Sequence, residues 1–268
     1  MLVLIGVFLS AIATTLTCLG FELTNQPFWY FLFVLVLFIT YFIIFLNVYW
    51  VLLLLLTLRY RKKEFVGKVN KFFLFNVRML AGFLIPLQGF FIKKKGFKNL
   101  PKEPSLILFN HVSDYDPWVL YKIMNGRYSF VGKRDLLNIP VIHQLSVSIG
   151  TLFVSHDKEE NYLMVDRAVD YITNKQTSVV IAPEGTRNNT GDLKPFKHGG
   201  FNIAVRSNCP IILVGFKGME DVLTKKKLAV KKVMVEVFDI IYPKDYENKT
   251  AGEIAEMCEE RYRKYLGQ

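Results

Sequence analysis

The charged residues are distributed so unevenly along the chain that its two parts must face different solvents. The sequence has 34 Lys and Arg and 23 Asp and Glu residues, yet only Glu22 precedes Arg59. Long uncharged apolar runs of this kind are typical of membrane-embedded helices. Residues 59–268 hold every other charge and have a net charge of +12, one above the +11 of the whole chain. The sequence therefore predicts a membrane anchor followed by a basic globular part.

Two uncharged apolar runs, residues 1–21 and 28–58, are each long enough to cross about 30 Å of hydrocarbon. A short polar turn, residues 22–27, separates them, and four basic residues follow the second run: Arg59, Arg61, Lys62 and Lys63. Because basic flanks stay on the cytoplasmic side, we expect residues 1–63 to form a transmembrane hairpin with the globular part on the cytoplasmic face. A cleaved signal peptide is the alternative for the first run, although no positive charge precedes it.

Residues 64–95 have a helical pattern in which apolar and basic side chains occupy different faces. The apolar positions recur at three-to-five-residue steps, while Lys68, Lys71 and Arg78 share another face. We expect an amphipathic helical segment at the membrane interface, broken at Gly82, Pro86 and Gly89 and followed by a second short apolar segment. The alternative is that its apolar residues cover the globular core. Those apolar positions are Phe65, Val69, Phe72, Val77, Leu80 and Leu84.

Residues 96–268 alternate short β-rich runs with helical stretches, which predicts an α/β catalytic domain with a mixed, mostly parallel sheet flanked by helices. The strands are expected at residues 105–109, 128–131, 151–154, 178–182, 210–216 and 233–241, and the helices at 117–124, 142–148, 159–174, 200–207 and 251–266. The last helix is expected to cap the sheet with a solvated amphipathic face.

The charge and the residue composition limit the classes of ligand that this domain is expected to bind. Its positive charge suits anionic lipids, phosphorylated substrates, acidic carrier proteins or nucleic acid, but no nucleic-acid-binding module is recognisable, so we expect no nucleic-acid partner. Cys18, Cys209 and Cys258 are far apart and form no CxxC pair, and the four histidines lack ligand spacing. We therefore expect no metal and no cofactor.

A first loop with reactive side chains follows the strand expected at residues 105–109. It holds His111 and Asp116, with Pro117 opening the next helix. On a tight connection, Asp116 can hold one ring nitrogen of His111 and leave the other free as a general base. The plainer alternative is that Asp116 only caps the helix and His111 is an ordinary loop residue, with Asp114 an exposed carboxylate.

A second loop, Pro183-Glu184-Gly185-Thr186-Arg187, also follows an expected strand. Arg187 offers a planar fork of donors for a phosphate, Gly185 permits close backbone approach, and the helix that begins near residue 199 adds amide donors. The alternative is an ordinary turn in which Glu184 and Arg187 form a surface ion pair.

The two loops together resemble the membrane glycerolipid acyltransferases typified by 1-acyl-glycerol-3-phosphate acyltransferase. The span from His111 to Asp116 is similar to the H-x4-D motif of that family, and residues 183–187 match its P-E-G-T-R motif. The Cys209-Pro210-Ile211 block and the regions around Lys133 and Gly150 are also similar. The resemblance covers residues 69–218, more than half of the chain.

The resemblance implies acyl transfer from acyl-CoA or acyl carrier protein to the sn-2 hydroxyl of lysophosphatidic acid, a lysophospholipid in the membrane, to form phosphatidic acid in phospholipid biosynthesis. It makes His111 the general base and Asp116 its orienting partner, with no covalent intermediate. It also makes the second loop the acceptor site.

One position departs from the family pattern. Where an arginine usually helps hold the acceptor phosphate, this chain has His156, so Arg187 must act with Lys133, Lys197 or His156. Glycerol-3-phosphate or another lysophospholipid remains an alternative acceptor, and a lipid hydrolase remains an alternative enzyme.

Overall fold

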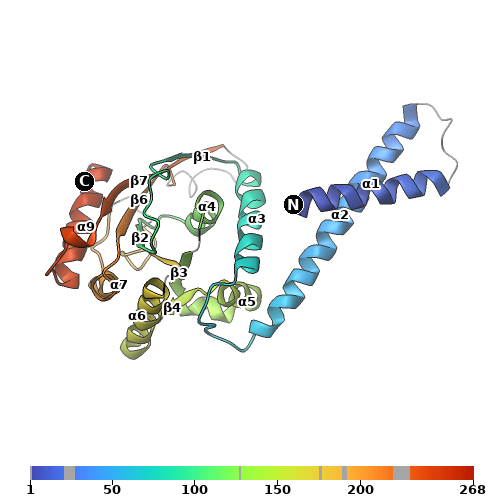
Figure 1. Cartoon of the computed structure of the whole chain (residues 1–268). Helices are drawn as coiled ribbons and strands as arrows, with labels where there is room; N and C mark the ends of the chain where they lie inside the picture. The colour runs from blue at the N-terminus through green and yellow to red at the C-terminus, as the bar shows by residue number, and fades with distance from the viewer. Residues whose placement is uncertain (1, 21–27, 127, 175–176, 189–191, 220–229) are drawn as a thin grey trace. The chain divides into compact units, whose positions relative to one another are not determined.

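The computed structural model describes residues 2–20, 28–126, 128–174, 177–188, 192–219 and 230–268 (Figure 1). Its contacts divide the chain into two compact units, Met1–Arg59 and Tyr60–Gln268. The boundary falls at the basic cluster that follows the second apolar run, so the change in composition coincides with a change in structure.

The first unit consists of two apolar helices, α1 (Leu2–Gly20) and α2 (Phe28–Thr57). They pack together where Gly6 leaves room for the ring of Phe45 and where the hydroxyls of Thr17 and Tyr41 lie 3.0 Å apart. Of the described residues, one helical segment, Leu32–Tyr60, is long and apolar enough to cross a membrane by length and composition, whereas the apolar segment Leu4–Leu19 is shorter. The expected turn at residues 22–27 lies outside the described residues, and a second crossing stays a prediction.

The second unit has the α/β order expected from the sequence. The short 3-10 helix η2 (Leu58–Tyr60) crosses the boundary in the chain, and η3 (Arg134–Asn138), η4 (His198–Phe201) and η5 (Pro243–Asp245) belong to the second unit. Its main elements are α3 (Lys71–Leu87), β1 (Phe90–Lys95), β2 (Leu106–Phe109), α4 (Asp116–Ile123), β3 (Tyr128–Lys133), α5 (Pro140–Ser148), β4 (Leu152–Val154), α6 (Lys158–Thr173), β5 (Ser178–Ile181), α7 (Asn202–Ser207), β6 (Ile211–Lys217), β7 (Lys231–Ile241) and α9 (Ala251–Leu266).

The strands form one sheet in the order β1-β7-β6-β2-β5-β3-β4. Strands β2 to β6 run parallel, β7 is antiparallel to β6, and β1 is parallel to β7. This arrangement confirms the predicted mixed, mostly parallel sheet. All four residues of the central strand β2 are buried, as expected of a strand covered on both faces.

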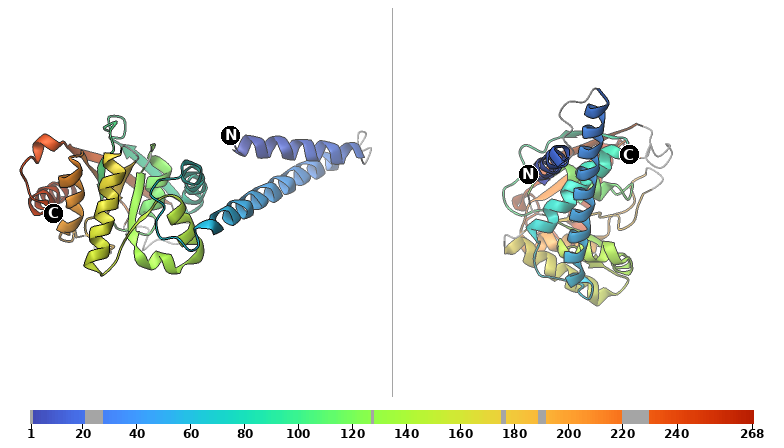
Figure 2. Two further views of the ribbon diagram at one scale, coloured as in Figure 1. Left: turned by 60° about the horizontal axis from the view of Figure 1, so that its bottom comes forward. Right: turned by 90° about the vertical axis from the view of Figure 1, so that its right-hand side faces the viewer.

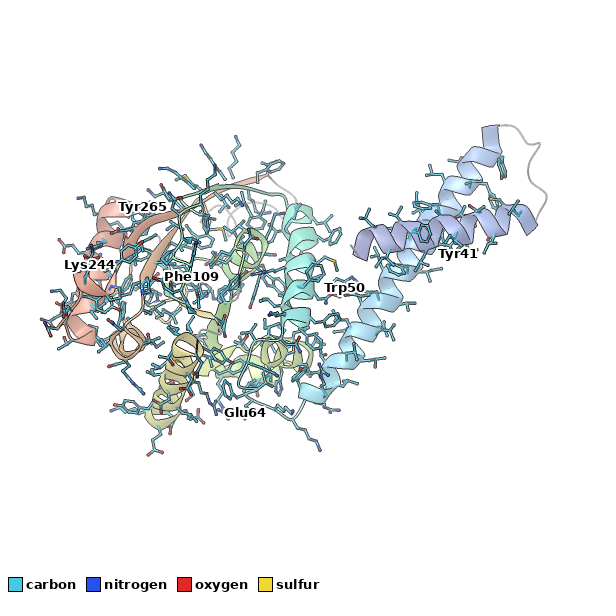
Figure 3. All side chains as sticks on the ribbon, in the orientation of Figure 1. Tyr41, Trp50, Glu64, Phe109, Lys244 and Tyr265 are labelled. Carbon is cyan, nitrogen blue, oxygen red and sulfur yellow. The ribbon has the colours of Figure 1, made fainter. Side chains whose placement is uncertain are left out.

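Two groups of helices lie on either side of the sheet (Figures 1 and 2). Helix α3 packs on α4 and α5, whereas α7 packs on α6 and α9. Aromatic side chains fill the core near the end of β2, where Phe109 lies (labelled in Figure 3). Its ring contacts the rings of Phe130 and Phe216. The two connections that carry the reactive residues therefore start from buried strands.

Each strand and helix expected in residues 96–268 is present, with its ends displaced by no more than two residues. Strand β1 was not predicted, because its Phe90-Phe91-Ile92 run is short and leads into three lysines that are exposed at the sheet edge. The second short apolar segment expected after the interfacial helix is therefore a strand.

Helix α3 belongs to the second compact unit and is apolar on two faces rather than one. Gly82 does not interrupt it, and Pro86 lies in its last turn. The inner face, which includes Phe73, Val77, Ala81 and Ile85, is buried in the core. The rest of the helix surface exposes five large side chains: Phe72, Phe75, Phe83, Leu84 and Leu87. The segment thus covers the core with one face, while contact of the other face with a membrane stays a prediction.

Two neighbouring phenylalanines test which face of α3 is buried. Phe73 is 1% exposed and packs edge-on against Tyr60, whereas Phe75 is 50% exposed. We expect Phe73→Ala to lower the free energy of unfolding by about 3–5 kcal/mol, because it leaves a cavity. Phe75→Ala should cost less than about 1 kcal/mol. Denaturant unfolding of both full-length variants in one detergent measures this, and equal losses would contradict the assigned faces.

Candidate active site

The two reactive loops meet at the carboxyl end of the parallel strands of the sheet. Strands β2 and β5 are parallel neighbours, with Leu106 paired to Val179 and Leu108 to Ile181. Their carboxyl ends therefore lie side by side, and ligands of α/β sheets bind at this end of the strands. The first loop (residues 110–116) leaves β2 and the second loop (residues 182–188) leaves β5.

His111 and Asp116 form the predicted pair. Nδ1 of His111 lies 2.8 Å from Oδ2 of Asp116, and the same oxygen accepts the backbone N–H groups of Val112 at 2.7 Å and Ser113 at 2.9 Å. The expected capping role of Asp116 is not observed, because its side chain turns back to the amides that precede α4 instead of those inside the helix. Phe109 supports the imidazole ring edge-on, with centroids 5.5 Å apart.

The surroundings of this pair fix the orientation of the imidazole ring. Asp116 is fully buried, and burial raises the pKa of its carboxyl, while His111 and the two backbone N–H groups act to lower it. A carboxylate oxygen accepts hydrogen bonds, so the pairing with Oδ2 assigns Nδ1 of His111 as the donor and directs Nε2 away from Asp116. The His111 side chain is 21% exposed, and Nε2 contacts no hydrogen-bonding group in the described part of the chain. The geometry is that of an oriented general base.

Glu184 has a different position from the one expected. It is 2% exposed, and its Oε1 accepts the N–H of His111 at 3.3 Å. Its Oε2 accepts the N–H of Lys194 and the side-chain amide of Asn188, both at 3.1 Å. Burial raises the pKa of the Glu184 carboxyl, and these donors act to lower it. Because both oxygens accept hydrogen bonds inside the protein, Glu184 braces the two loops, and its contact with an acceptor stays a prediction.

The second loop holds both backbone groups of His111. In addition to the bond from His111 N–H to Glu184, the backbone N–H of Asn188 donates to the carbonyl of His111 at 2.6 Å. Sequence reasoning missed Asn188, which follows the P-E-G-T-R stretch directly. The position of the catalytic candidate therefore depends on a loop about 73 residues away in the chain.

Arg187 reaches across to the first loop. Its Nη1 lies 2.6 Å from Oδ2 of Asp114, and both side chains are exposed. The surface pair between Glu184 and Arg187 that the sequence allowed is therefore not the pair observed. Lys194, another residue that sequence reasoning missed, fixes this turn by donating to Oγ1 of Thr186 at 3.2 Å and to the carbonyl of Arg187 at 2.7 Å.

Gly185 brings Lys197 into the second loop. Gly185 has φ of +67°, and a Cβ at this position would lie 2.8 Å from Nζ of Lys197. The lysine side chain therefore lies over the glycine, and its backbone N–H donates to the carbonyl of Pro183. A side chain at position 185 would both strain the backbone and displace the cation.

Lys133 and His156 also lie at the carboxyl end of the strands, but they are not beside His111. Lys133 ends β3 and His156 follows β4, and both are exposed. Strand β3 is separated from β2 by β5, and β4 lies one strand further out. At about 4.8 Å per strand, the positions are roughly 10 and 14 Å from β2 across the sheet. Their role toward an acceptor stays a prediction.

Several supports of the site come from distant parts of the chain. The side chain of Asn110 exchanges two hydrogen bonds with the backbone of Phe216, which ties the end of β2 to β6. From α9, Glu259 accepts the N–H of Phe196, and the Tyr262 hydroxyl lies 2.8 Å from the carbonyl of Leu108. Helix α9 therefore does more than cap the sheet. No local sequence pattern predicts these contacts, because their partners are up to 154 residues apart in the chain.

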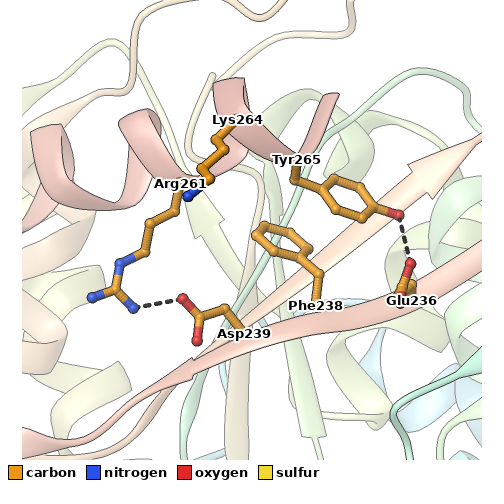
Figure 4. Close-up of a pocket in the computed structure, with 6 residues that line it drawn as sticks. All are labelled: Glu236, Phe238, Asp239, Arg261, Lys264 and Tyr265. Atoms are coloured by element: carbon orange, nitrogen blue, oxygen red, sulfur yellow. Dashed lines mark hydrogen bonds and ion pairs between the residues drawn. The ribbon is translucent and has the colours of Figure 1, made fainter. Parts of the chain in front are cut away.

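Two further findings concern metal binding and a pocket in the second unit, apart from the two reactive loops. Among the described residues, no group of three or more His, Cys, Asp or Glu side chains is placed to hold a metal ion. A separate open pocket of about 580 Å³ lies between β7 and α9 (Figure 4). It is lined by Glu236, Phe238, Asp239, Arg261, Lys264 and Tyr265, none of which belongs to the reactive loops.

Part of this chain, including both reactive loops, is similar in sequence to known proteins. The family model described as Acyltransferase matches residues 91–217, which include both reactive loops. A 1-acyl-sn-glycerol-3-phosphate acyltransferase of Saccharomyces cerevisiae is 27% identical over 174 residues, which cover 64% of this chain and 57% of that protein. The protein of the same name from Haemophilus influenzae is 25% identical over 217 residues, which cover 79% of this chain and 85% of the other.

The fold is also similar to a solved structure. The crystal structure of the 1-acyl-sn-glycerophosphate (LPA) acyltransferase PlsC from Thermotoga maritima matches with a TM-score of 0.59 and 19% identity, over 72% of this chain and 78% of the other. The chain spans just over half the length of the yeast relative and of the human alpha relative. A buried Asp116 holds His111 at the end of β2, and the family model spans both loops, so residues 91–217 are similar to the acyltransferase family.

Proposed function

We propose that the protein transfers a fatty acyl group from a thioester to the sn-2 hydroxyl of lysophosphatidic acid, which forms phosphatidic acid. The observation that carries this proposal is the oriented general base, His111 Nδ1 to Asp116 Oδ2 at 2.8 Å, with Nε2 left for a substrate hydroxyl. The names of the yeast and Haemophilus influenzae relatives support the choice of acceptor.

The chemistry is a direct displacement. Nε2 of His111 takes the proton of the acceptor hydroxyl while the oxygen attacks the thioester carbon. Asp116 stabilises the imidazolium that forms, because its carboxylate is already bonded to the other ring nitrogen. The C–S bond then breaks, and the leaving thiolate takes the proton back from His111. The reaction needs no covalent enzyme intermediate and no cofactor besides the acyl donor, which is acyl-CoA or acyl carrier protein.

The acceptor is held by the cations of the second loop. Arg187 lies beside the first loop and presents a planar fork for a phosphate, and Lys197 lies over Gly185. The exposed Lys133 and His156 lie further along the carboxyl end of the sheet, where Lys133 adds positive charge and His156 adds a ring nitrogen. Because His156 replaces an arginine, glycerol-3-phosphate or a lysophospholipid with a larger headgroup is the main alternative acceptor.

The anchor brings the enzyme to its lipid substrate. Segment Leu32–Tyr60 has the length and composition of a membrane span, and the basic residues Arg59, Arg61, Lys62 and Lys63 follow its apolar part. By the positive-inside rule this end faces the cytoplasm. The globular unit would then meet lysophosphatidic acid at the cytoplasmic headgroup layer, where acyl-CoA and acyl carrier protein are available.

The first test measures product from purified full-length protein in detergent. Acyl-CoA and acyl carrier protein are each offered with lysophosphatidic acid, glycerol-3-phosphate or lysophosphatidylcholine. We expect phosphatidic acid as the main product. A different acylated product would change the acceptor, and free fatty acid alone would indicate a hydrolase in place of a transferase.

His111→Ala should lower kcat at least a hundredfold, because a positioned general base contributes about 10²–10⁴ in rate. His143→Ala is the matched control, since His143 lies on α5 and binds the carbonyl of Lys63. The unfolding midpoint of each variant shows whether it is folded. Full activity of a folded His111→Ala variant would exclude the mechanism.

Glu184→Gln should lower both the free energy of unfolding and kcat. A carboxylate accepts all three N–H donors that surround Glu184, whereas an amide turns its own NH2 toward at least one of them, at a cost of about 1.5–3 kcal/mol. Thermal unfolding and steady-state kinetics measure the two effects, with the exposed Glu256→Gln as control. A higher KM with unchanged stability would instead support a direct contact with the acceptor.

A further inference from the structure

The two reactive loops are joined by an ion pair at their exposed rim. Nη1 of Arg187 and Oδ2 of Asp114 are 2.6 Å apart. Asp114 lies between His111 and Asp116 on the first loop. Asn188, which follows Arg187, donates its backbone N–H to the carbonyl of His111, so Arg187 and the general base are held by the same two loops. Any acceptor whose hydroxyl reaches His111 therefore brings its headgroup toward an arginine that already has an anionic partner.

The partner of Arg187 is easily exchanged. The side chains of Arg187 and Asp114 are 51% and 75% exposed. Pairs with this exposure contribute little to stability, because water and salt screen them. A phosphate carries up to two charges and three acceptor oxygens, and it binds an arginine fork through two parallel bonds. It therefore competes for Arg187 at least as well as one carboxylate oxygen does.

The other carboxylates of the site are not available for this exchange. Glu184 is buried, and its two oxygens accept N–H groups of His111, Lys194 and Asn188. Asp116 is fully buried against His111. In the described part of the two loops, Asp114 is thus the carboxylate that can move without breaking the arrangement around the base.

We propose that Asp114 is a specificity-determining residue that occupies Arg187 until the phosphate of the acceptor displaces it. This inference rests on the proposed function, because it takes Arg187 as the group that binds the phosphate. Asp114 lowers the affinity for every phosphate-bearing acceptor by competing for the same donors. It does not affect an acceptor that lacks a phosphate, since such an acceptor leaves the ion pair intact.

Asp114→Asn tests this competition, because the amide keeps the shape of the side chain and removes its charge. We expect the KM for lysophosphatidic acid to fall two- to fivefold, the range set by an exposed ion pair. The KM for 1-monoacylglycerol, which has the same chain and free hydroxyl but no phosphate, should not change. In an Arg187→Ala background, the additional Asp114→Asn change should have no effect on the KM for lysophosphatidic acid.

A matched control separates this effect from a change in surface charge. Arg206 of α7 and Asp166 of α6 form an exposed pair with the same separation of 2.6 Å, outside the two reactive loops. Asp166→Asn alters the net charge by the same amount, and we expect it to leave both KM values unchanged. An equal decrease in both variants would reduce the result to long-range attraction of an anionic substrate and would overturn the proposal.

A binding measurement keeps the inference separate from the proposed function. Inorganic phosphate should bind the Asp114→Asn protein two- to fivefold more tightly than the wild type, as read from the phosphate dependence of the thermal unfolding midpoint. If wild type makes no phosphatidic acid but this difference is found, the proposed function fails and the exchange at Arg187 stands. If the variant binds phosphate no better, or if its KM for lysophosphatidic acid rises, Asp114 positions Arg187 and does not compete for it, and the proposal is wrong.

Discussion

The arrangement of the site depends on one buried carboxylate that accepts three N–H groups, one from each reactive loop and one from Lys194. Glu184 bonds the backbone of His111 through one oxygen and the second loop through the other. An ionised carboxylate is stable in such a place only while its acceptor sites are filled. Loss of any one donor therefore disfavours the whole arrangement, so the two loops keep their relative position together or lose it together.

Three acidic residues near the general base have separate tasks because their burial differs. Asp116 is enclosed and serves the imidazole ring, and Glu184 is enclosed and serves the backbone. Asp114 is open to solvent and serves a cation that a substrate can also use. Solvent exposure thus separates the groups that hold geometry from the one that can exchange partners. The adjacency of β2 and β5 in the sheet brings all three together.

Local sequence patterns were sufficient to predict most of the strands and the His111–Asp116 pair. Short apolar runs placed the strands within two residues, and the strand–loop–helix context of His111 and Asp116 indicated their pairing across five positions. Long-range contacts had no such signal. The brace by Glu184 joins residues 73 positions apart, and the support from Tyr262 joins residues 154 apart, so both emerge only when the sheet order is known. Strand β1 was missed because lysines at a sheet edge resemble a solvated loop.

Helix α3 imposes a condition on how this protein can be handled. Its inner face is part of the core, so the helix cannot be removed together with the anchor. Its outer face exposes Phe72, Phe75, Phe83, Leu84 and Leu87, an apolar stripe whose contact with water is unfavourable. A fragment that begins after the apolar helices would therefore still self-associate or need detergent. A truly soluble form requires polar residues along this stripe in addition to truncation.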